Sequence, residues 1–213
     1  MRKGVATPSR EGVDEKSSRE HLLDAASAVM IEEGTADVSL HAIARKAGLT
    51  APLVTYHFGS KEGLLLALAR RATGRSMEQL QELVAMPVPP EKKLRIHISG
   101  IIRNYARYPY LNNLLNLLLR HEASETAQSL KAAFVAPLAA AQRAIIEEGV
   151  ASGRFRPIDP ALAYFMITGA AQSYFSSNRI TVKLILGGEP DQADVERYAR
   201  EVGDMVLNGL LRS

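Results

Sequence analysis

The segment SLHAIARKAGLTAPLVTYHFGSK, residues 39–61, constrains the fold of this 213-residue chain more than any other stretch. Apolar residues recur at helical spacing from Leu40 to Ala47, which predicts a short helix with one buried face. Ser39 stands before this run and suits an N-cap, whereas Gly48 follows it and suits the left-handed conformation that closes a helix. The segment therefore predicts a short helix with a sharp turn directly after it.

A second short helix is predicted after this turn. Thr50 is its expected N-cap, and Pro52 falls in the first turn, where a missing backbone N–H costs little. Leu53 and Val54 provide its apolar contacts. Two helices joined in this way match a helix-turn-helix, whose second helix lies in the major groove of DNA. An αα-hairpin inside a helical bundle has the same spacing, so spacing alone leaves both interpretations open.

The exposed side of the second helix carries most of the predicted DNA contacts. Small residues at its start let the backbone approach DNA, and the polar groups further along can bond phosphates or base edges. The candidate DNA-binding residues are Ser39, His41, Thr50, Ala51, Pro52, Thr55, Tyr56, His57 and Lys61. We assign Thr55 to base reading, and His57 and Lys61 to phosphate contacts. Tyr56 can bond a phosphate or pack on a thymine methyl, whereas Phe58 is expected in the core.

The local charge around this segment suits a polyanion. Between residues 38 and 75 the only acid is Glu62. The basic residues in the same span are Arg45, Lys46, Lys61, Arg70, Arg71 and Arg75. The whole chain has 26 Lys and Arg against 23 Asp and Glu, a net charge of only +3. Nucleic-acid binding is therefore predicted from the local charge and not from the overall composition.

The run AIARKAGLTAPLVTYHFGSKEGLL resembles the DNA-binding domain of the tetracycline-repressor (TetR) family. The matching features are the A-x-x-A-G-hydrophobic-Ser/Thr turn, the YHF end of the second helix, and S-K-E-x-L opening the next helix. Thr55 stands where Tyr is frequent in that family, and Ala51 and Pro52 replace the commoner Lys and Gly. The operator sequence is therefore left open. The resemblance covers the first third of the chain, beyond which only length and helical character agree.

The resemblance implies a ligand-responsive transcriptional regulator, most often a repressor released from a palindromic operator by a small-molecule effector. It implies an all-α fold, in which an N-terminal three-helix helix-turn-helix domain precedes a larger helical domain for effector binding and dimerisation. In that family the last two helices pair with their copies in a homodimer. An activator or co-repressor-dependent regulator of the same fold, a helical adaptor and a helical enzyme are the alternatives.

The chain divides into three predicted segments. Residues 1–16 are expected to be a flexible N-terminal arm, residues 17–84 the DNA-binding domain with its linking helix, and residues 85–213 the effector-binding and dimerisation domain. Ser17 and Glu20 have the spacing of a capping box, which predicts that the first helix begins there. Helical periodicity continues through the last segment without strand pairing, which predicts an all-α chain.

Glycine and proline mark the special positions in the long helices. A linking helix is predicted from Ser60 to Val84, and Gly63 and Gly74 should weaken it locally. Close packing would explain either glycine equally well, and Gly74 could instead be a point of motion. Pro137 lies inside a predicted helix and should bend it.

Polar residues embedded in the apolar helices of the last segment indicate a ligand pocket. A buried polar group without a partner costs about 1–3 kcal/mol, so solvent, another helix or a ligand must satisfy each one. A ligand pocket has mostly apolar walls with a few convergent polar groups. The candidate ligand-binding residues are Tyr105, Asn112, Asn116, Arg120, His121, Gln172 and Tyr174. The effector itself cannot be identified from these residues.

Composition and motifs argue against several other classes of protein. The chain has no Cys, which excludes disulfides and thiolate chemistry. None of the five His falls in H-E-x-x-H, and there is neither a P-loop nor a G-x-G-x-x-G, so no enzyme, metal or cofactor is expected. No apolar stretch approaches the roughly 20 residues of a membrane span and no secretory signal is visible, so a cytoplasmic protein without a membrane partner is expected.

Overall fold

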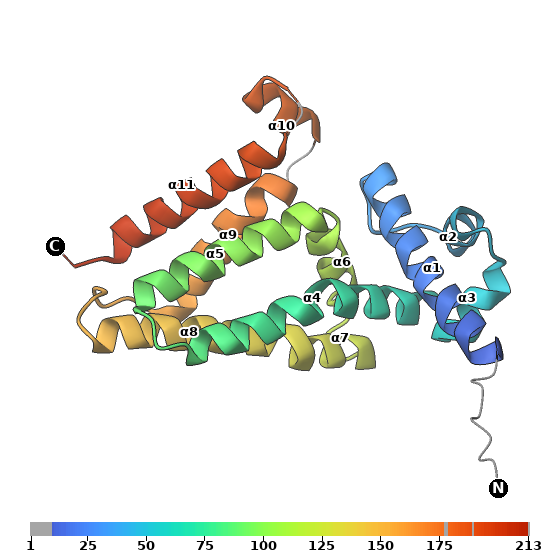
Figure 1. The fold of residues 1–213 in the computed structure, drawn as a ribbon, viewed down its shortest axis with the longest axis horizontal. Coiled ribbons are helices and arrows are strands. Elements are labelled where there is room, and N and C mark those ends of the chain that lie inside the picture. The colour runs from blue at the N-terminus through green and yellow to red at the C-terminus, as the bar shows by residue number, and fades with distance from the viewer. Residues whose placement is uncertain (1–9, 177–178, 189, 213) are drawn as a thin grey trace, which may run out of the picture. The chain divides into compact units, whose positions relative to one another are not determined.

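The computed structural model describes residues 10–176, 179–188 and 190–212, and most of these residues are helical (Figure 1). The helices are α1 Arg10–Glu33, α2 Leu40–Ala47, α3 Ala51–Phe58, α4 Lys61–Ala85, α5 Pro90–Arg107, α6 Leu111–Leu118, α7 Glu125–Leu130, the π-helix η1 Lys131–Val135, α8 Ala136–Ala151, α9 Pro160–Ser176, α10 Arg179–Leu186 and α11 Gln192–Leu210. The β-pairing recorded in the described part is one isolated bridge, between Phe155 and Leu211. The all-α prediction is confirmed.

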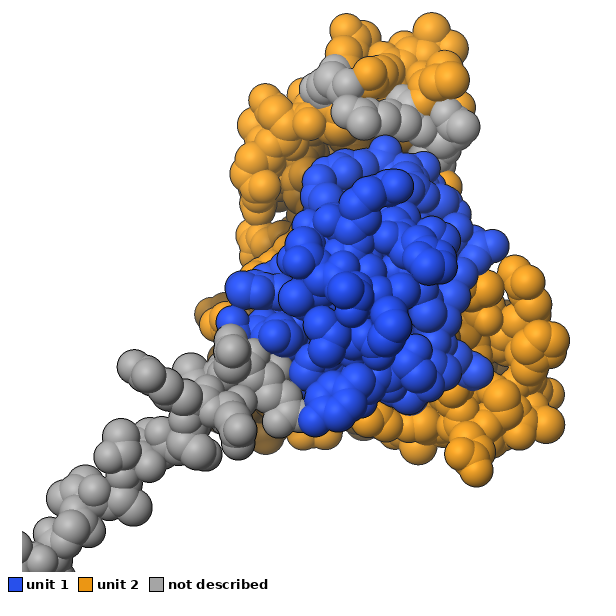
Figure 2. Space-filling view, turned by 90° about the vertical axis from the view of Figure 1, so that its right-hand side faces the viewer, with its two compact units in different colours: residues 1–68 blue, residues 69–213 orange. Residues whose placement is uncertain are grey.

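Backbone contacts divide the chain into two compact units, residues 1–68 and 69–213 (Figure 2). The division falls inside α4, so this helix belongs to both units. The sequence-based assignment had kept the whole of the linking helix with the first domain. A helix shared in this way connects the two units covalently through a continuous hydrogen-bonded backbone.

Unit 1 is built from α1, α2, α3 and the start of α4. Helix α1 packs on α2, and α2 packs on α3. The core contains fully buried side chains from each of these helices: Leu22, Met30, Ile43, Val54 and Leu64. Their burial fixes the orientation of α2 and α3 within the unit, because each helix has only one apolar face to bury.

The first helix begins earlier than the sequence predicts. Helix α1 starts at Arg10, so Ser17 and Glu20 lie inside it and the predicted capping box at its start is wrong. The stretch between Arg10 and Ser17 contains no proline, and serine costs only a few tenths of a kcal/mol inside a helix, so the helix can extend through it. The first nine residues of the predicted arm, 1–9, lie outside the described residues.

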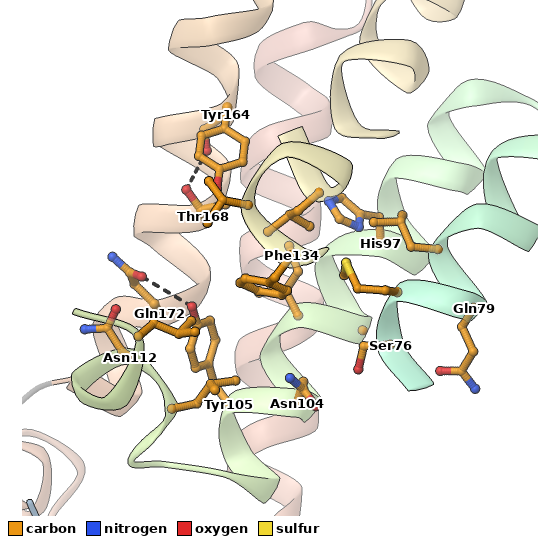
Figure 3. Close-up of a pocket in the computed structure, with 18 of the residues that line it drawn as sticks. Ser76, Gln79, His97, Asn104, Tyr105, Asn112, Phe134, Tyr164, Thr168 and Gln172 are labelled. Carbon is orange, nitrogen blue, oxygen red and sulfur yellow. Dashed lines mark hydrogen bonds between the residues drawn. The ribbon is translucent and has the colours of Figure 1, made fainter. Parts of the chain in front are cut away.

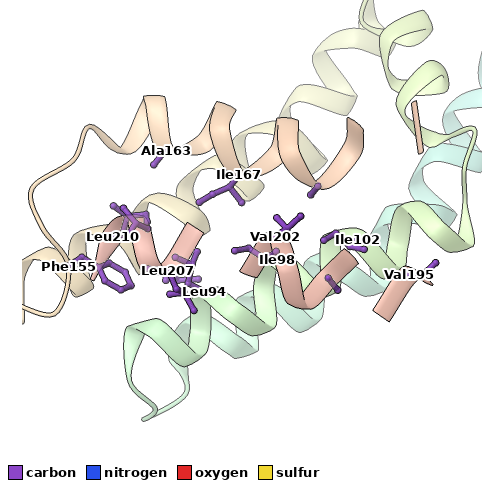
Figure 4. Close-up of a cluster of buried hydrophobic side chains, with 14 residues drawn as sticks. Leu94, Ile98, Ile102, Phe155, Ala163, Ile167, Val195, Val202, Leu207 and Leu210 are labelled. Atoms are coloured by element: carbon purple, nitrogen blue, oxygen red, sulfur yellow. The ribbon is translucent and has the colours of Figure 1, made fainter. Parts of the chain in front are cut away.

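Unit 2 is organised around α5, which contacts α8, α9 and α11 (Figure 1). Buried side chains from these four helices form its main hydrophobic cluster (Figure 4), which includes Leu94, Ile98, Ile102, Ile145, Ile167 and Val202. Lys93 is buried beside this cluster, and its ammonium group donates to the carbonyl of Val84 at 2.9 Å and to Glu148 at 2.8 Å. Lys93 therefore ties the end of α4 to α8.

A π-helical segment lies just before Pro137, where the sequence predicts a bend. The π-helix η1 directly precedes α8, in which Pro137 lies in the first turn. Proline has no N–H to donate to the carbonyl four residues earlier, that of Ala133, which lies in η1. One missing hydrogen bond therefore coincides with the local change in helical pitch.

The continuous helical run Glu125–Ala151 is long and apolar enough to cross a membrane by length and composition alone. The expectation that no stretch approaches this length is therefore wrong. A core helix passes the same test, and Leu138, Gln142, Ile145 and Ile146 of this run are buried in unit 2. The run thus gives only weak support for a membrane span.

The two glycines of α4 differ in their surroundings. A Cβ added at Gly63 would overlap the backbone carbonyl oxygen of Phe58, at the end of α3. A Cβ added at Gly74 would meet no heavy atom within 4 Å. Close packing therefore explains Gly63 and does not explain Gly74.

Candidate nucleic-acid interface and cavity

The turn between α2 and α3 has the geometry that the sequence predicts. The hydroxyl oxygen of Ser39 accepts a hydrogen bond from the Ala42 N–H at 3.1 Å, which caps α2. Gly48 has a φ of 67°, and the Leu49 N–H donates to the Ala44 carbonyl at 2.9 Å. Together with the bond from the Gly48 N–H to the Arg45 carbonyl at 3.2 Å, the Leu49 bond forms a Schellman motif, which ends α2 and redirects the chain into α3. Local hydrogen bonds therefore set the angle at which α3 leaves the turn.

Helix α3 turns one side to the core and the other to solvent. Val54 is completely buried, whereas Pro52 and Thr55 are exposed and the side chain of Tyr56 is 70% exposed. Ala51 and His57 are half-buried. An exposed aromatic side chain beside a short hydroxyl side chain can contact both apolar and polar groups of a nucleic acid.

The residues at the two ends of α3, and His41 of α2, lie beside the exposed side of α3 or contact neighbouring helices. Thr50 occupies the N-cap position of α3, but its hydroxyl makes no capping hydrogen bond. Phe58 is half-buried, and the guanidinium of Arg19 lies 5.0 Å from its ring centre. His41, in the first turn of α2, is exposed. Phe58 therefore contributes to holding α3 on α1, although it is not fully enclosed.

The basic residues of unit 1 are partly engaged by carboxylates of the same unit. The ammonium group of Lys61 lies 2.8 Å from Asp37, and that of Lys46 lies 2.6 Å from Glu32. These pairs are solvent-exposed, and exposed pairs of this kind contribute about 0–1 kcal/mol. A phosphate can therefore replace either carboxylate at little cost.

Unit 2 contains a cavity of about 530 Å³ (Figure 3). Side chains from α4, α5, α6, η1, α8 and α9 line it, and most are apolar. The labelled polar side chains in Figure 3 come from four helices: Ser76 and Gln79 of α4, His97, Asn104 and Tyr105 of α5, Asn112 of α6, and Tyr164, Thr168 and Gln172 of α9. The cavity has the size of a site for a small organic molecule.

Four of the seven predicted ligand-binding residues line this cavity: Tyr105, Asn112, Asn116 and Gln172. Arg120 and His121 are exposed residues after the end of α6 and are not part of the lining. Tyr174 also lies outside it and stacks on Tyr198 with ring centres 4.9 Å apart. The structure therefore brings the first four residues together and leaves the other three elsewhere.

Several lining residues were missed because they share a helix face rather than a sequence motif. Tyr164 and Thr168 precede Gln172 by eight and four residues, and His97 and Asn104 are seven residues apart. Both spacings place side chains on one side of a helix. Helical spacing from Gln172 backwards would have found the α9 residues.

Burial keeps the ionisable lining residues neutral. Desolvation lowers the pKa of His97 to about 4, against the opposing effect of its hydrogen bond to Gln142 at 3.2 Å. Desolvation raises the pKa of Tyr105 to about 12, and it also raises the pKa of Tyr164. The Tyr105 hydroxyl therefore stays protonated, and it donates a long hydrogen bond of 3.4 Å to Gln172 (Figure 3).

Two family models match separate parts of the chain. One, described as Tetracyclin repressor-like, C-terminal domain, matches residues 86–213, and the other, described as Bacterial regulatory proteins, tetR family, matches residues 22–68. The chain belongs to the tetR family. It is a DNA-binding transcriptional regulator and not an enzyme, as the sequence predicted.

Individual relatives agree with this assignment. The HTH-type transcriptional repressor NicS of Pseudomonas putida is 29% identical over 92% of this chain and 93% of its own length. The ketosteroid transcriptional regulator of Mycobacterium tuberculosis has a TM-score of 0.75 at 19% identity, covering 100% of both chains. The regulator FadR from Bacillus subtilis, solved in complex with stearoyl-CoA, has a TM-score of 0.68 at 22% identity, covering 89% of this chain and 98% of its own. At these identities the structural likeness shows a shared fold.

Proposed function

We propose that this chain is a cytoplasmic repressor that binds a palindromic operator as a homodimer and releases it when a small molecule enters the cavity of unit 2. The observation that carries DNA reading is the exposed face of α3. Thr55 and the largely exposed Tyr56 project from a helix whose opposite side is anchored by Val54. Polar and aromatic groups on a rigid helix are what base and phosphate contacts require.

The nine predicted DNA-binding residues belong to α3 or to the segments before and after it in the sequence. Ser39 and His41 are exposed at the start of α2, where backbone N–H groups can approach a phosphate. Lys61 is the first residue of α4, and we propose that its ammonium group leaves Asp37 and pairs with a DNA phosphate. The contacts from Thr50 to His57 come from the N-cap and body of α3.

Dimerisation is proposed through α9 and α11. Leu162, Phe165 and Met166 of α9 are more than half exposed, and Met205 of α11 is 75% exposed. A shallow hollow between these two helices has almost entirely apolar side chains, including those of Ala170 and Met205. Large exposed apolar patches of this kind mark association sites. Ala171 of α9 is fully buried in the core of unit 2 and is not part of this patch.

Effector response is proposed through α4. Ser76, Met77, Leu80 and Leu83 of this helix line the cavity, and the same helix begins with Lys61 in unit 1. A ligand changes the DNA-bound population only when it binds the two arrangements with different affinity. Support for a small-molecule effector comes from the fold relative that was solved with stearoyl-CoA.

Selection of bound sequences from a random DNA pool is the direct test. We expect enrichment of a palindrome whose half-sites lie about 34–36 Å apart, one helical turn of DNA. Titration of the selected duplex should give one dimer or a pair of dimers per site, and Tyr56→Phe should weaken binding without unfolding the protein. No enrichment of any sequence would refute operator binding. Tighter DNA binding in the presence of a cavity ligand would establish the co-repressor alternative.

A further inference from the structure

The side chains around the cavity of unit 2 are uncharged throughout. Among the described lining residues there is no Lys, Arg, Asp or Glu. The polar groups are amides, such as those of Asn104, Asn112 and Gln172, and hydroxyls, such as those of Tyr105 and Thr168. The remaining wall is aliphatic or aromatic. The cavity thus offers hydrogen bonds but no counter-charge.

The opening of the cavity is uncharged as well. Gln79, Asn116 and Ile96 are exposed members of the lining, and Phe165, which also belongs to the proposed dimer surface, is 70% exposed in the single chain. A ligand group that remained near the solvent would therefore meet amide, aliphatic and aromatic side chains. Neither a Lys nor an Arg side chain is among the described residues that line the cavity at its opening.

Cations on α5 form ion pairs with residues outside the lining. Arg95 lies 2.7 Å from Asp204, and Arg103 lies 2.7 Å from Glu196. Both acids belong to α11, which does not line the cavity. Lys93 is buried and donates to Glu148 at 2.8 Å. Recruiting any of these cations to a ligand would break an existing pair.

The ionisable lining groups do not change this balance. His97 and Tyr105 are both neutral at physiological pH because burial opposes their charged forms. An ionised ligand group moved into such a site would lose its hydration without gaining a partner of opposite charge, which opposes its binding. Electrostatics therefore select against both anions and cations.

We infer that the effector is an uncharged, mostly apolar molecule with hydroxyl, carbonyl or ether oxygens. This inference rests on the proposed function, since it names the ligand class of the same cavity. The Tyr105 hydroxyl is a suitable donor, because its bond to Gln172 is 3.4 Å long, whereas such bonds are commonly about 2.7–2.8 Å. A ligand oxygen can replace that weak bond with a shorter one.

Matched probes that differ only in charge test the inference. The first set is 1-octanol, octanoate and octylammonium, and the second is 2-naphthalenemethanol, 2-naphthoate and 2-naphthylmethylammonium. Each is titrated into the full chain at pH 7.5 and followed by calorimetry. We expect at least one neutral probe to bind, with its anionic and cationic counterparts at least about tenfold weaker, or 1.4 kcal/mol.

Two variants test whether the probes bind in the cavity and whether an added carboxyl group changes their selectivity. Gly100 lines the cavity, and a Cβ there meets no heavy atom within 4 Å, so Gly100→Phe should fill the site without a backbone clash. Gly74→Phe is the control, because Gly74 has the same open surroundings outside the lining. Gln172→Glu keeps the side-chain shape and adds a carboxyl group. It should increase the affinity for octylammonium at least about tenfold, since a buried ammonium then gains a partner.

The outcomes separate this inference from the proposed function. A charged probe that binds as tightly as its neutral counterpart, or no binding of either neutral probe, overturns the inference. The same holds if Gly100→Phe leaves binding unchanged or Gln172→Glu gains no affinity for octylammonium. Each of these results leaves operator binding intact. Failure of the proposed function would instead appear in the DNA selection, where no palindrome would be enriched.

Discussion

The substitution Gly63→Ala tests how closely α4 approaches the end of α3, the helix that we propose reads DNA. A methyl group at Gly63 would overlap the backbone oxygen of Phe58 and lie 3.2 Å from its carbonyl carbon. Backbone atoms cannot rotate away as a flexible side chain can. The Gly63 N–H also donates to the Ser60 hydroxyl at 3.0 Å, which fixes the first turn of α4. The new methyl group must therefore displace the end of α3.

The expected magnitude follows from two opposing contributions. Overpacking at a tight contact costs about 1–3 kcal/mol. Replacing glycine by alanine inside a helix recovers about 0.5–1 kcal/mol. Because the added Cβ would overlap a backbone oxygen, the upper end of the overpacking range applies, and the net destabilisation of unit 1 should be about 2 kcal/mol. This lowers the melting temperature of a small domain by roughly 8–16 °C. Operator affinity should fall at least about tenfold if the displaced α3 loses 1.4 kcal/mol of contacts.

Gly74→Ala is the matched control in the same helix. A Cβ at Gly74 meets no heavy atom within 4 Å, so only the helix-propensity gain remains and stability should rise. Circular-dichroism melting and fluorescence-anisotropy titration of a selected operator duplex should be run on both variants. If Gly63→Ala is as stable and binds as tightly as the parent, the close approach of α4 to Phe58 is wrong.

Four further measurements test separate parts of the proposal. Lys61→Ala should weaken binding to all DNA sequences alike and lower the slope of log affinity against log salt concentration by about one unit. Asp37→Asn should strengthen binding, because it releases Lys61 for a phosphate. Unchanged affinity of Lys61→Ala at several salt concentrations would exclude the contact. Gly169→Glu should convert the dimer to a monomer in light scattering, and a monomeric parent at micromolar concentration would remove the basis for a palindrome. The pKa of His97 is about 4 when folded and 6.5 in the reference state, so the unfolded chain takes up the proton first. Its contribution to the free energy of unfolding is therefore complete above pH 6.5, and that free energy falls by roughly 3 kcal/mol as the pH drops to 4. In denaturant titrations at several pH values, His97→Gln should remove this part of the pH dependence. An unaltered profile would show that His97 is not its source. Tyr56→Phe should melt like the parent but bind the operator more weakly, and equal binding would place its hydroxyl away from DNA.

Local sequence signals were sufficient for the helix-turn-helix. Ser39 caps α2 and Gly48 closes it with a positive φ, and both roles depend on atoms within a few residues along the chain. Val54 was predicted to face the core from helical spacing alone, and it is completely buried. Backbone hydrogen bonds of this range do not need a tertiary partner, so the sequence determined the turn, the two helices and the face of α3 that is exposed.

The start of α1 shows where local reasoning failed. Ser17 and Glu20 have the spacing of a capping box, yet both lie inside a helix that begins at Arg10. The same residue types are acceptable at an N-cap and within a helix, so the pattern could not distinguish the two positions. Propensity differences of a few tenths of a kcal/mol are too small to fix a helix boundary.

The cavity was decided by tertiary packing. Ser76 of α4 and Thr168 of α9 both line it, although they are far apart in the sequence. Polar residues in apolar helices indicated a pocket, but Arg120, His121 and Tyr174 share that local character and lie outside the lining. Which polar group faces the cavity depends on how α5 and α9 are rotated about their axes when their apolar faces pack together. The sequence determined that unit 2 has helices with polar groups among apolar ones, and only their packing decided which of those groups converge and that none of the described lining residues is charged.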